Sequence, residues 1–402
     1  MTRILEDIRV LDLTMFLAGP FAGRILADLG AEVIKVEPLT GDPSRRGQGL
    51  VPGSTPHPQF VALHRNKRSI TIDLKQPEAR KVFYELVARS DVLVENYRPG
   101  VTKRLGIDYD ALAKVNPRLV YCSMSGFGSN GPDADKPAFD AIIQAISGTM
   151  SITGTEDRPP SLMGLYLGDL AAPSFGVHGI LAALYARQKR NQGCHLDMSL
   201  LEGILYLAPG QTQTYFQKGE VSGRHGSGYG GAGANARAFL TADNKYVEVM
   251  CPYPKFQESL RQLIGSLPGF EQAMQDARFA TPDGRGEHLK DYWGLLDKAF
   301  KTKTLKEWLD VLNKMDVPCA PINTIAEAVQ NPQLLYRGFV SEVDVPGLGK
   351  KKTVSSPFNF NSFPRKANSS PPILGEHTAE VLKQVLGYTS ERIAALKAAK
   401  DI

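Results

Sequence analysis

Hydrophobic and polar positions in the first part of the chain follow two alternating patterns. The run IRVLDL at residues 8–13 is apolar enough for a buried strand, and AEVIKVEP at 31–38 repeats that pattern. Between them, PFAGRILADLG at 20–30 has helical spacing, opens on Pro20 and closes on Gly30. The stretch therefore predicts one strand–helix–strand unit of a parallel sheet.

The same alternation recurs further along the chain. SITIDL at 69–74 predicts a strand, PEARKVFYELVARS at 77–90 a helix, and DVLVEN at 91–96 another strand. A further strand is expected from residue 118, followed by a helix at about 138–150. Alternating strands and helices are typical of a parallel sheet with helices on its faces, so the predicted fold class is α/β.

The pattern changes in the second half of the chain. Residues 222–239 read SGRHGSGYGGAGANARAF, with too many glycines for a stable helix or strand, and so predict a loop. FLTADNKYVEVM at 239–250 predicts a hairpin, and the helices expected after it lie near 254–264, 288–300 and 304–314. A chain of 402 residues is longer than one core usually grows. We therefore expect a large domain from residues 1–224 with 326–402 and a smaller α+β domain from 225–325.

Composition narrows the classes of partner. The net charge of +5 is mild for this length, which disfavours nucleic acid and permits an anionic small ligand. The four cysteines are too far apart for a zinc site or a disulfide framework, and no metal is expected; they are Cys122, Cys194, Cys251 and Cys319. The start, MTRILEDIRVLDL, does not resemble a signal peptide, and no later window is expected to span a membrane. A cytoplasmic protein is predicted, or one of an organelle matrix if a targeting segment was removed.

The first strand–helix turn lacks the glycines of a dinucleotide site. Gly19 and Gly23 in LAGPFAG do not have the G-x-G-x-x-G spacing that lets the backbone approach a pyrophosphate. The chain also has no G-x-S-x-G nucleophile elbow and no histidine pair with metal-ligand spacing. An NAD-dependent oxidoreductase and a serine hydrolase are therefore both disfavoured.

Two basic clusters lie in consecutive strand–helix units. HRNKRSITIDLK at 64–75 and NYRPGVTKRLG at 96–106 carry seven lysines and arginines; they are Arg65, Lys67, Arg68, Lys75, Arg98, Lys103 and Arg104. Such runs are most often solvated faces. Here both clusters could flank one crevice at the carboxyl ends of the strands, where a phosphate-bearing polyanion would fit.

Asp169 is the single formal charge in MGLYLGDLAAPSFGVHGILAAL, residues 163–184. A helix is expected at 169–188, so this aspartate is placed where an N-cap belongs, with Pro173 in the tolerated first turn. A carboxylate without a neighbouring cation is also a candidate for chemistry. The physical pattern alone favours the cap, although one residue can begin a helix and face a cleft at the same time.

Several motifs, taken in order, resemble the class III CoA-transferases, the family of formyl-CoA transferase and carnitine CoA-transferase. These motifs are VLDLTMFLAGPFA, LADLGAEVIKVEP, HRNKRSI, DVLVENYRPG, SGFG, LGDL, the glycine-rich loop and PPILGEHT. The resemblance spans nearly the whole chain. It implies a Rossmann-like large domain, an interlocked ring-like homodimer, and acyl-CoA and small carboxylic acids as ligands, with coenzyme A as a substrate and no permanently bound cofactor.

The resemblance also implies roles for individual residues. Asp169 matches the family's nucleophile, which forms an aspartyl anhydride and then an aspartyl-CoA thioester. Glycines of the loop would close over the site and stabilise an oxyanion; they are Gly228, Gly230, Gly231 and Gly233. Positions matching the CoA contacts are Ile72, Lys75, Asn96, Tyr97 and Arg104. The acyl pocket is assigned to Met15, Leu17 and Phe139.

Departures from the family pattern bear on the substrate. Positions 15 to 17 and 139 are apolar where the formyl-CoA:oxalate enzymes are expected to have polar groups, which favours a longer or less polar acyl group; they are Met15, Phe16, Leu17 and Phe139. Resemblance to dicarboxylate-using relatives suggests succinyl-CoA or another dicarboxylyl-CoA as donor. A 2-methylacyl-CoA racemase of the same fold is the alternative, but that family uses a histidine in the segment matching 138–140, and Phe139 cannot transfer a proton. A CoA-binding protein without turnover is a third possibility.

Overall fold

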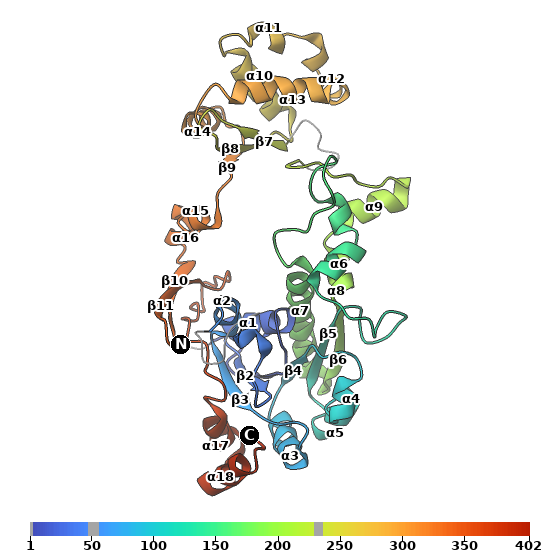
Figure 1. Ribbon diagram of the computed structural model, residues 1–402, viewed down its shortest axis with the longest axis vertical. Coiled ribbons are helices and arrows are strands. Elements are labelled where there is room, and N and C mark those ends of the chain that lie inside the picture. Colours follow the sequence, from blue (N-terminus) through green and yellow to red (C-terminus); the bar gives the residue numbers. More distant parts are fainter. Residues whose placement is uncertain (1–2, 47–55, 229–235) are drawn as a thin grey trace. The chain divides into compact units, whose positions relative to one another are not determined.

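The chain forms two compact units in a computed structural model that describes residues 3–46, 56–228 and 236–402 (Figure 1). The larger unit comprises Met1–Ser147, Met163–Gly210 and Pro332–Ile402. The smaller unit comprises Gly148–Leu162 and Gln211–Asn331. The larger unit thus contains both the N-terminal and the C-terminal part of the chain.

The smaller unit also includes residues 148–162, 211–224 and 326–331, which the sequence assigns to the large domain. Thr155 forms an isolated antiparallel bridge with His225. The Arg224 guanidinium donates hydrogen bonds to the carbonyl oxygens of Thr155, Glu156 and Arg158 at 3.0–3.2 Å. These contacts join polar groups of segments that are distant in sequence. The pattern of hydrophobic and polar positions therefore does not predict them.

A six-stranded parallel sheet forms the centre of the larger unit, in the order β3-β2-β1-β4-β5-β6. The strands are β1 (Arg9–Asp12), β2 (Glu32–Glu37), β3 (Lys67–Thr71), β4 (Val92–Glu95), β5 (Val120–Ser125) and β6 (Cys194–Ser199). This is the order of a doubly wound Rossmann sheet, and it confirms the predicted α/β class. Strand order reverses between β1 and β4, and ligands of such sheets bind at the carboxyl ends of the strands beside that switch point.

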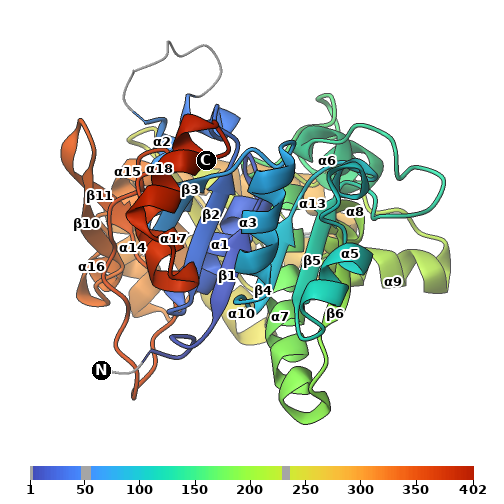
Figure 2. The ribbon, with the colours of Figure 1, turned by 90° about the horizontal axis from the view of Figure 1, so that it is seen from below.

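Helices cover both faces of the sheet. Alternate strand residues point to opposite faces, so Leu11 and Val10 enter two separate hydrophobic clusters. The face of Val10 packs against α1 (Ala18–Asp28) and α7 (Leu167–Arg190). The opposite face carries α3 (Pro77–Val87), α5 (Tyr109–Val115), α17 (Thr378–Leu386) and α18 (Ser390–Ala398), with α3 and α17 in front in Figure 2.

Small residues let α7 approach the sheet closely. A Cβ atom on Gly176 would lie 2.7 Å from Met124 Cε, and one on Gly179 would lie 2.6 Å from Leu196 Cδ2. By length and composition α7 could also cross a membrane, which the sequence analysis did not anticipate, but 44% of its most apolar window is buried inside the protein. Its glycine-bearing side is therefore a packing surface for β5 and β6.

Shorter elements complete the larger unit. They are η1 (Pro43–Arg45), α2 (Pro58–His64), α4 (Val101–Leu105), α6 (Asp140–Ile146), α8 (Leu200–Tyr206), α16 (Pro332–Tyr336) and the antiparallel pair β10 (Val340–Val345) and β11 (Gly349–Val354). Helix α9 (Pro209–Lys218) begins at the end of the larger unit and continues into the smaller one.

The smaller unit has an antiparallel sheet of three strands and a separate hydrophobic core. The predicted hairpin is confirmed as β7 (Ala236–Leu240) and β8 (Tyr246–Met250), with β9 (Cys319–Pro321) beside β8. The helices and turns are η2 (Thr149–Ile152), α10 (Pro254–Gly265), α11 (Glu271–Met274), η4 (Ala277–Phe279), α12 (Pro282–Glu287), α13 (Leu289–Phe300), α14 (Leu305–Lys314) and α15 (Ile325–Ala328). Trp308 is fully buried in the core and donates to the Phe300 carbonyl at 2.7 Å, and Trp293 packs against the same cluster.

Candidate active site

Asp169 lies in the first turn of α7 and is not the residue that caps the helix. The helix begins at Leu167, and within the described chain the N-cap residue Tyr166 makes no capping side-chain hydrogen bond. The capping role predicted for Asp169 is therefore wrong. Pro173 is also deeper in the helix than predicted, and because proline has no N–H it cannot donate the usual helical bond to the carbonyl of Asp169.

The cap comes instead from Asp140, the first residue of α6. Its Oδ1 accepts from the backbone N–H groups of Gly168 at 2.8 Å and Asp169 at 3.3 Å. Its Oδ2 accepts from Gln144 Nε2 at 2.6 Å. The first N–H groups of a helix have no partner within the helix, so a carboxylate there satisfies them and complements the helix dipole. Because Asp140 caps the helix, the Asp169 side chain is not needed for that role.

The Asp169 carboxylate is half-buried and electrostatically strained. Across residues 3–46, 56–228 and 236–402, no group donates a hydrogen bond to it and no cation pairs with it. Burial, followed by the negative charge of Asp140, raises the pKa of Asp169 to about 7. A carboxylate that is basic, unpaired and partly accessible is a candidate nucleophile.

A cavity of about 360 Å³ lies where β1, β2, β3 and β4 end. It brings together five of the residues assigned to ligand binding; they are Met15, Ile72, Lys75, Tyr97 and Arg104. Val36, Leu74, Val101 and Leu105 add apolar wall. The cavity therefore lies where a doubly wound sheet binds its ligand, beside the switch between β1 and β4.

Lys75 and Arg104 are the cations that face this cavity. Both side chains are exposed, and neither meets an acidic partner in the part of the chain that the structure describes. Burial raises the pKa of Tyr97 to about 12, so its phenol is neutral. An apolar cavity with two unpaired cations suits a ligand that has an apolar body and phosphate groups.

The basic residues at 65–68, in the first part of the 64–75 cluster, do not line this cavity. Arg65 pairs with Asp28 at 2.6 Å, Lys67 pairs with Asp12 at 2.7 Å, and Arg68 pairs with Glu32 at 2.6 Å. Arg65 and Lys67 are buried. The idea that both clusters flank one crevice is therefore wrong for residues 64–68, because acidic residues distant in sequence already neutralise these charges.

The remaining predicted residues lie in different surroundings. The side-chain amide of Asn96 forms hydrogen bonds with the backbone of Met15. Leu17 is buried. Phe139 is exposed, and its ring lies edge-to-face with that of Phe16 at a distance of 6.3 Å between ring centres. Gly228 donates its N–H to the His225 carbonyl at 3.1 Å within the smaller unit. The other loop glycines lie outside the described residues; they are Gly230, Gly231 and Gly233.

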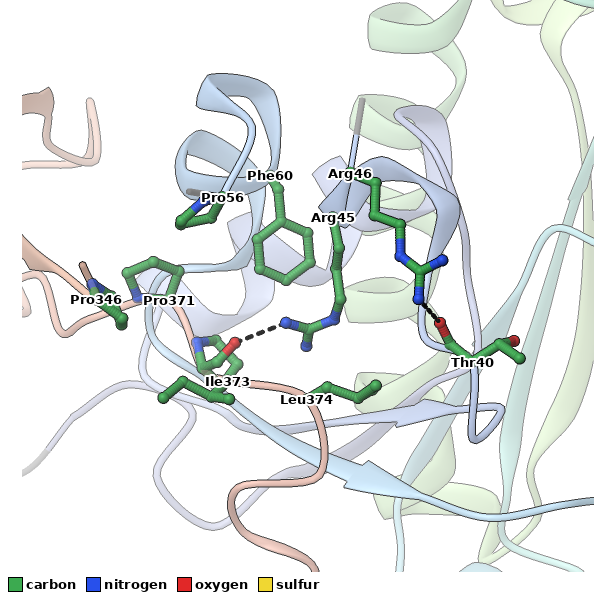
Figure 3. A pocket seen from close by; sticks show the side chains of 10 residues that line it. Thr40, Arg45, Arg46, Pro56, Phe60, Pro346, Pro371, Ile373 and Leu374 are labelled. Atoms are coloured by element: carbon green, nitrogen blue, oxygen red, sulfur yellow. Dashed lines mark hydrogen bonds between the residues drawn. The ribbon is translucent and has the colours of Figure 1, made fainter. Parts of the chain in front are cut away.

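A second cavity of about 360 Å³ lies beside η1 and the C-terminal segment (Figure 3). Figure 3 shows Arg45 crossing it, with the guanidinium stacked at 4.2 Å from the Phe60 ring centre and donating to the Pro372 carbonyl at 2.9 Å. Arg45 also pairs with Glu37 at 2.6 Å. Arg45 therefore already has partners, whereas Arg46, which also lines the cavity, is exposed and donates to the Thr40 carbonyl at 3.5 Å.

Comparison with known proteins decides the family. The sequence matches the family described as CoA-transferase family III over residues 5–378. This chain belongs to CoA-transferase family III. The CoA-transferase is 35% identical over 100% of its length to the succinyl-CoA–D-citramalate CoA-transferase of Chloroflexus aurantiacus, and covers 98% of that enzyme. It is 36% identical to the formyl-CoA:oxalate CoA-transferase of Streptomyces avermitilis, over 99% of each chain.

Two further relatives extend this result. The mouse (Mus musculus) succinyl-CoA:glutarate CoA-transferase is 34% identical, over 98% of this chain and 88% of that enzyme. A CAIB/BAIF family protein from Brucella suis has a crystal structure with a TM-score of 0.86, at 32% identity over 96% of this chain and 100% of that one. The resemblance noted in the sequence is therefore confirmed, and CoA thioesters and carboxylic acids are the substrates of this enzyme class.

Sequence reasoning missed Asp140 as a part of the site. Asp140 binds the start of α7, which begins 27 residues later at Leu167, and no local sequence pattern indicates that contact.

Among the described residues no group of three or more histidine, cysteine, aspartate or glutamate side chains could hold a metal ion.

Proposed function

We propose that this CoA-transferase moves CoA from a dicarboxylyl-CoA, with succinyl-CoA as the first donor to test, to a free carboxylic acid. The observation that carries the proposal is the Asp169 carboxylate, which is half-buried, free of donors among the described residues and raised in pKa to about 7. Such a group gains basicity and loses the hydrogen bonds that would weaken its attack.

The proposed reaction has four steps and needs no net proton transfer. The Asp169 carboxylate attacks the thioester carbonyl, the carbon–sulfur bond breaks, and a mixed anhydride and CoA thiolate form. The thiolate attacks the aspartyl carbonyl of the anhydride, which releases the donor acid and leaves an aspartyl-CoA thioester. The acceptor carboxylate then attacks that thioester and the thiolate leaves. Finally the thiolate takes the new acyl group and frees Asp169.

CoA is proposed to occupy the cavity at the ends of β1 to β4. Lys75 and Arg104 would bind its phosphates, and Ile72 and Tyr97 would contact its apolar parts. Phosphate binding far from the thioester can then be used to hold the reacting carbon against Asp169. Met15 and Phe139 are proposed to border the acyl group, together with Leu17 from the start of α1.

The glycine-rich loop is proposed to supply N–H groups to the oxyanion and to exclude water during the reaction, through Gly228, Gly230, Gly231 and Gly233. Both intermediates are activated acyl groups that water would hydrolyse. A closed site would therefore protect each turnover.

An interlocked homodimer is also proposed, and exposed apolar side chains near the start of α7 support it. Phe139 and Leu165 are each 63% exposed, and Tyr206, whose ring meets that of Phe175 at 5.1 Å, is 75% exposed. Exposed apolar side chains that form a contiguous patch are typical of an interface. Light scattering should give twice the chain mass of 43.9 kDa.

Covalent trapping tests the proposed nucleophile. The enzyme is incubated with succinyl-CoA, quenched with hydroxylamine, digested and analysed by mass spectrometry. A hydroxamate on Asp169 is expected in the wild type and in the control Asp157→Asn, which changes an exposed aspartate. An active enzyme that is labelled elsewhere, or transfer that survives Asp169→Ala, would overturn the assignment. Deuterium uptake at the α-carbon without transfer would instead indicate a racemase.

A further inference from the structure

The loop Thr14–Leu17, which follows β1, touches both parts of the candidate site. Met15 lines the cavity at the strand ends. The next residue, Phe16, packs its ring edge-to-face on Phe139 at 6.3 Å and 88°. Phe139 directly precedes Asp140, which holds the backbone of Asp169. A change in this loop would therefore move the cavity wall relative to the nucleophile.

The backbone of this loop is strained. Phe16 has a φ of 66°, in the left-handed region that aromatic residues rarely adopt. Such a conformation costs about 1–3 kcal/mol and persists only where the surroundings enforce it. The loop must therefore be held from outside.

Besides Asp12 at the end of β1, which accepts from the Thr14 N–H at 3.0 Å, three side chains hold the loop from both sides of the switch point in the sheet. Asn96, directly after β4, accepts from Met15 N–H and donates to the Met15 carbonyl, both at 2.8 Å. Lys35 Nζ, from β2, donates to the Thr14 carbonyl at 2.7 Å. Asp42 Oδ1 accepts from Phe16 N–H at 3.4 Å. The loop is thus fixed at three consecutive residues.

A buried charge network supports these contacts. Lys35 pairs with Asp42 at 2.9 Å and Lys67 with Asp12 at 2.7 Å, and all four side chains have zero exposure. Beside them, burial and the Lys67 and Lys35 cations keep the pKa of His64 well below its usual value. Apolar residues often stabilise a core as well as buried ion pairs do. The network is therefore better explained by the geometry that it enforces than by stability.

We propose that Asn96 and Lys35 are positioning residues that fix the loop Thr14–Leu17, and with it Met15, between the CoA cavity and Asp169. The inference rests on the proposed function, because the thioester must meet Asp169 at the end of that cavity. It also assigns Asn96 a task different from the direct CoA contact implied by the family resemblance.

Asn96→Leu tests the inference, since leucine has a similar size but cannot bind the Met15 backbone. A positioning role predicts that kcat falls about 10- to 100-fold, as small misplacements of reacting groups do. The Kd for free CoA, measured by calorimetry, should stay within about threefold of the wild type. Amide hydrogen exchange at Met15 should become faster in the variant.

Asn116→Leu is the matched control. Asn116 also binds backbone through its side chain, because it donates to the carbonyls of Val87 at 3.0 Å and Ser90 at 2.8 Å. It precedes β5, however, and so lies at the amino ends of the strands, opposite the cavity. This variant should lose stability and keep the wild-type kcat. Equal losses of kcat in both variants would overturn the inference.

Other outcomes separate this inference from the proposed function. A large rise in the CoA Kd of Asn96→Leu with unchanged kcat would show a direct contact and overturn the positioning role. A wild type that binds CoA but transfers it to no acid would overturn the proposed function. Unchanged exchange at Met15 in Asn96→Leu would, independently of activity, overturn the clamp. Lys35→Met should lower kcat as well, and its loss should not add fully to that of Asn96→Leu because both residues act on one loop.

Discussion

Asp140 and Asp169 form a pair in which one carboxylate organises the helix and the other is left basic. Burial and then Asp140 raise the pKa of Asp169, so the nucleophile gains its charge as the pH rises through about 7. Transfer is therefore expected to accelerate over that range. Asp140→Asn keeps an oxygen that can accept from Gly168 but removes the negative charge, so it should lower the pKa of Asp169.

The pH dependence of kcat/KM, measured for the wild type and for Asp140→Asn, checks this prediction. The acidic limb of the profile should move to lower pH in Asp140→Asn, since less alkaline conditions then suffice to ionise Asp169. Identical limbs in both proteins would contradict the electrostatic coupling.

Lys75 and Arg104 allow a separate prediction for CoA binding. Replacing either by glutamine removes a charge-assisted hydrogen bond to phosphate worth about 1.5–3 kcal/mol, which corresponds to a Kd raised about 10- to 100-fold. Titration calorimetry with free CoA measures the change. Lys103→Gln is the control, because Lys103 neighbours Arg104 on α4 but does not line the cavity. An equal loss in the control would point to a general electrostatic effect.

At the scale of elements, the contact between α7 and α8 supports the nucleophile. A Cβ atom on Gly203 of α8 would lie 2.8 Å from the Cα of Ala172, three residues after Asp169. Gly203→Ala must push α8 from α7 and should cost about 1–3 kcal/mol of unfolding free energy. Gly294→Ala, in α13, is the matched control because no other described heavy atom lies within 4 Å of the added methyl.

Urea denaturation of the two alanine variants checks the packing. The midpoint of the larger unit's transition should fall for Gly203→Ala, and that of the smaller unit's transition should rise slightly for Gly294→Ala, since alanine favours helix by about 1 kcal/mol over glycine. A midpoint unchanged in Gly203→Ala would show that α8 can shift without cost.

Sequence patterns predicted the elements far better than the contacts between them. Strands such as β1 and β4 have consecutive buried apolar residues because both faces of a parallel sheet are covered, and that signal is local. The ion pairs that Lys35 and Asp12 form could not be predicted, because the pairing of a buried charge depends on partners distant in sequence. Asp169 was found through a family motif, whereas its cap by Asp140 and the positive φ of Phe16 needed the structure.

At the scale of the whole molecule, the division into two units determines what tryptophan fluorescence can report. The chain has 2 tryptophans, Trp293 and Trp308, and both belong to the smaller unit. The proposed CoA cavity lies entirely in the larger one. Indole fluorescence therefore observes the unit that does not carry this cavity, while circular dichroism observes both.

Comparison of the two signals during heating would report whether the units unfold together. Because each unit has its own hydrophobic core, we expect two transitions, with CoA raising only the one that fluorescence does not see. If the two signals change at the same temperature and CoA raises both, the two units unfold as one, and CoA binding in the larger unit also stabilises the unit that contains the tryptophans. The natural tryptophans would then serve as a label-free sensor of substrate binding in the other unit.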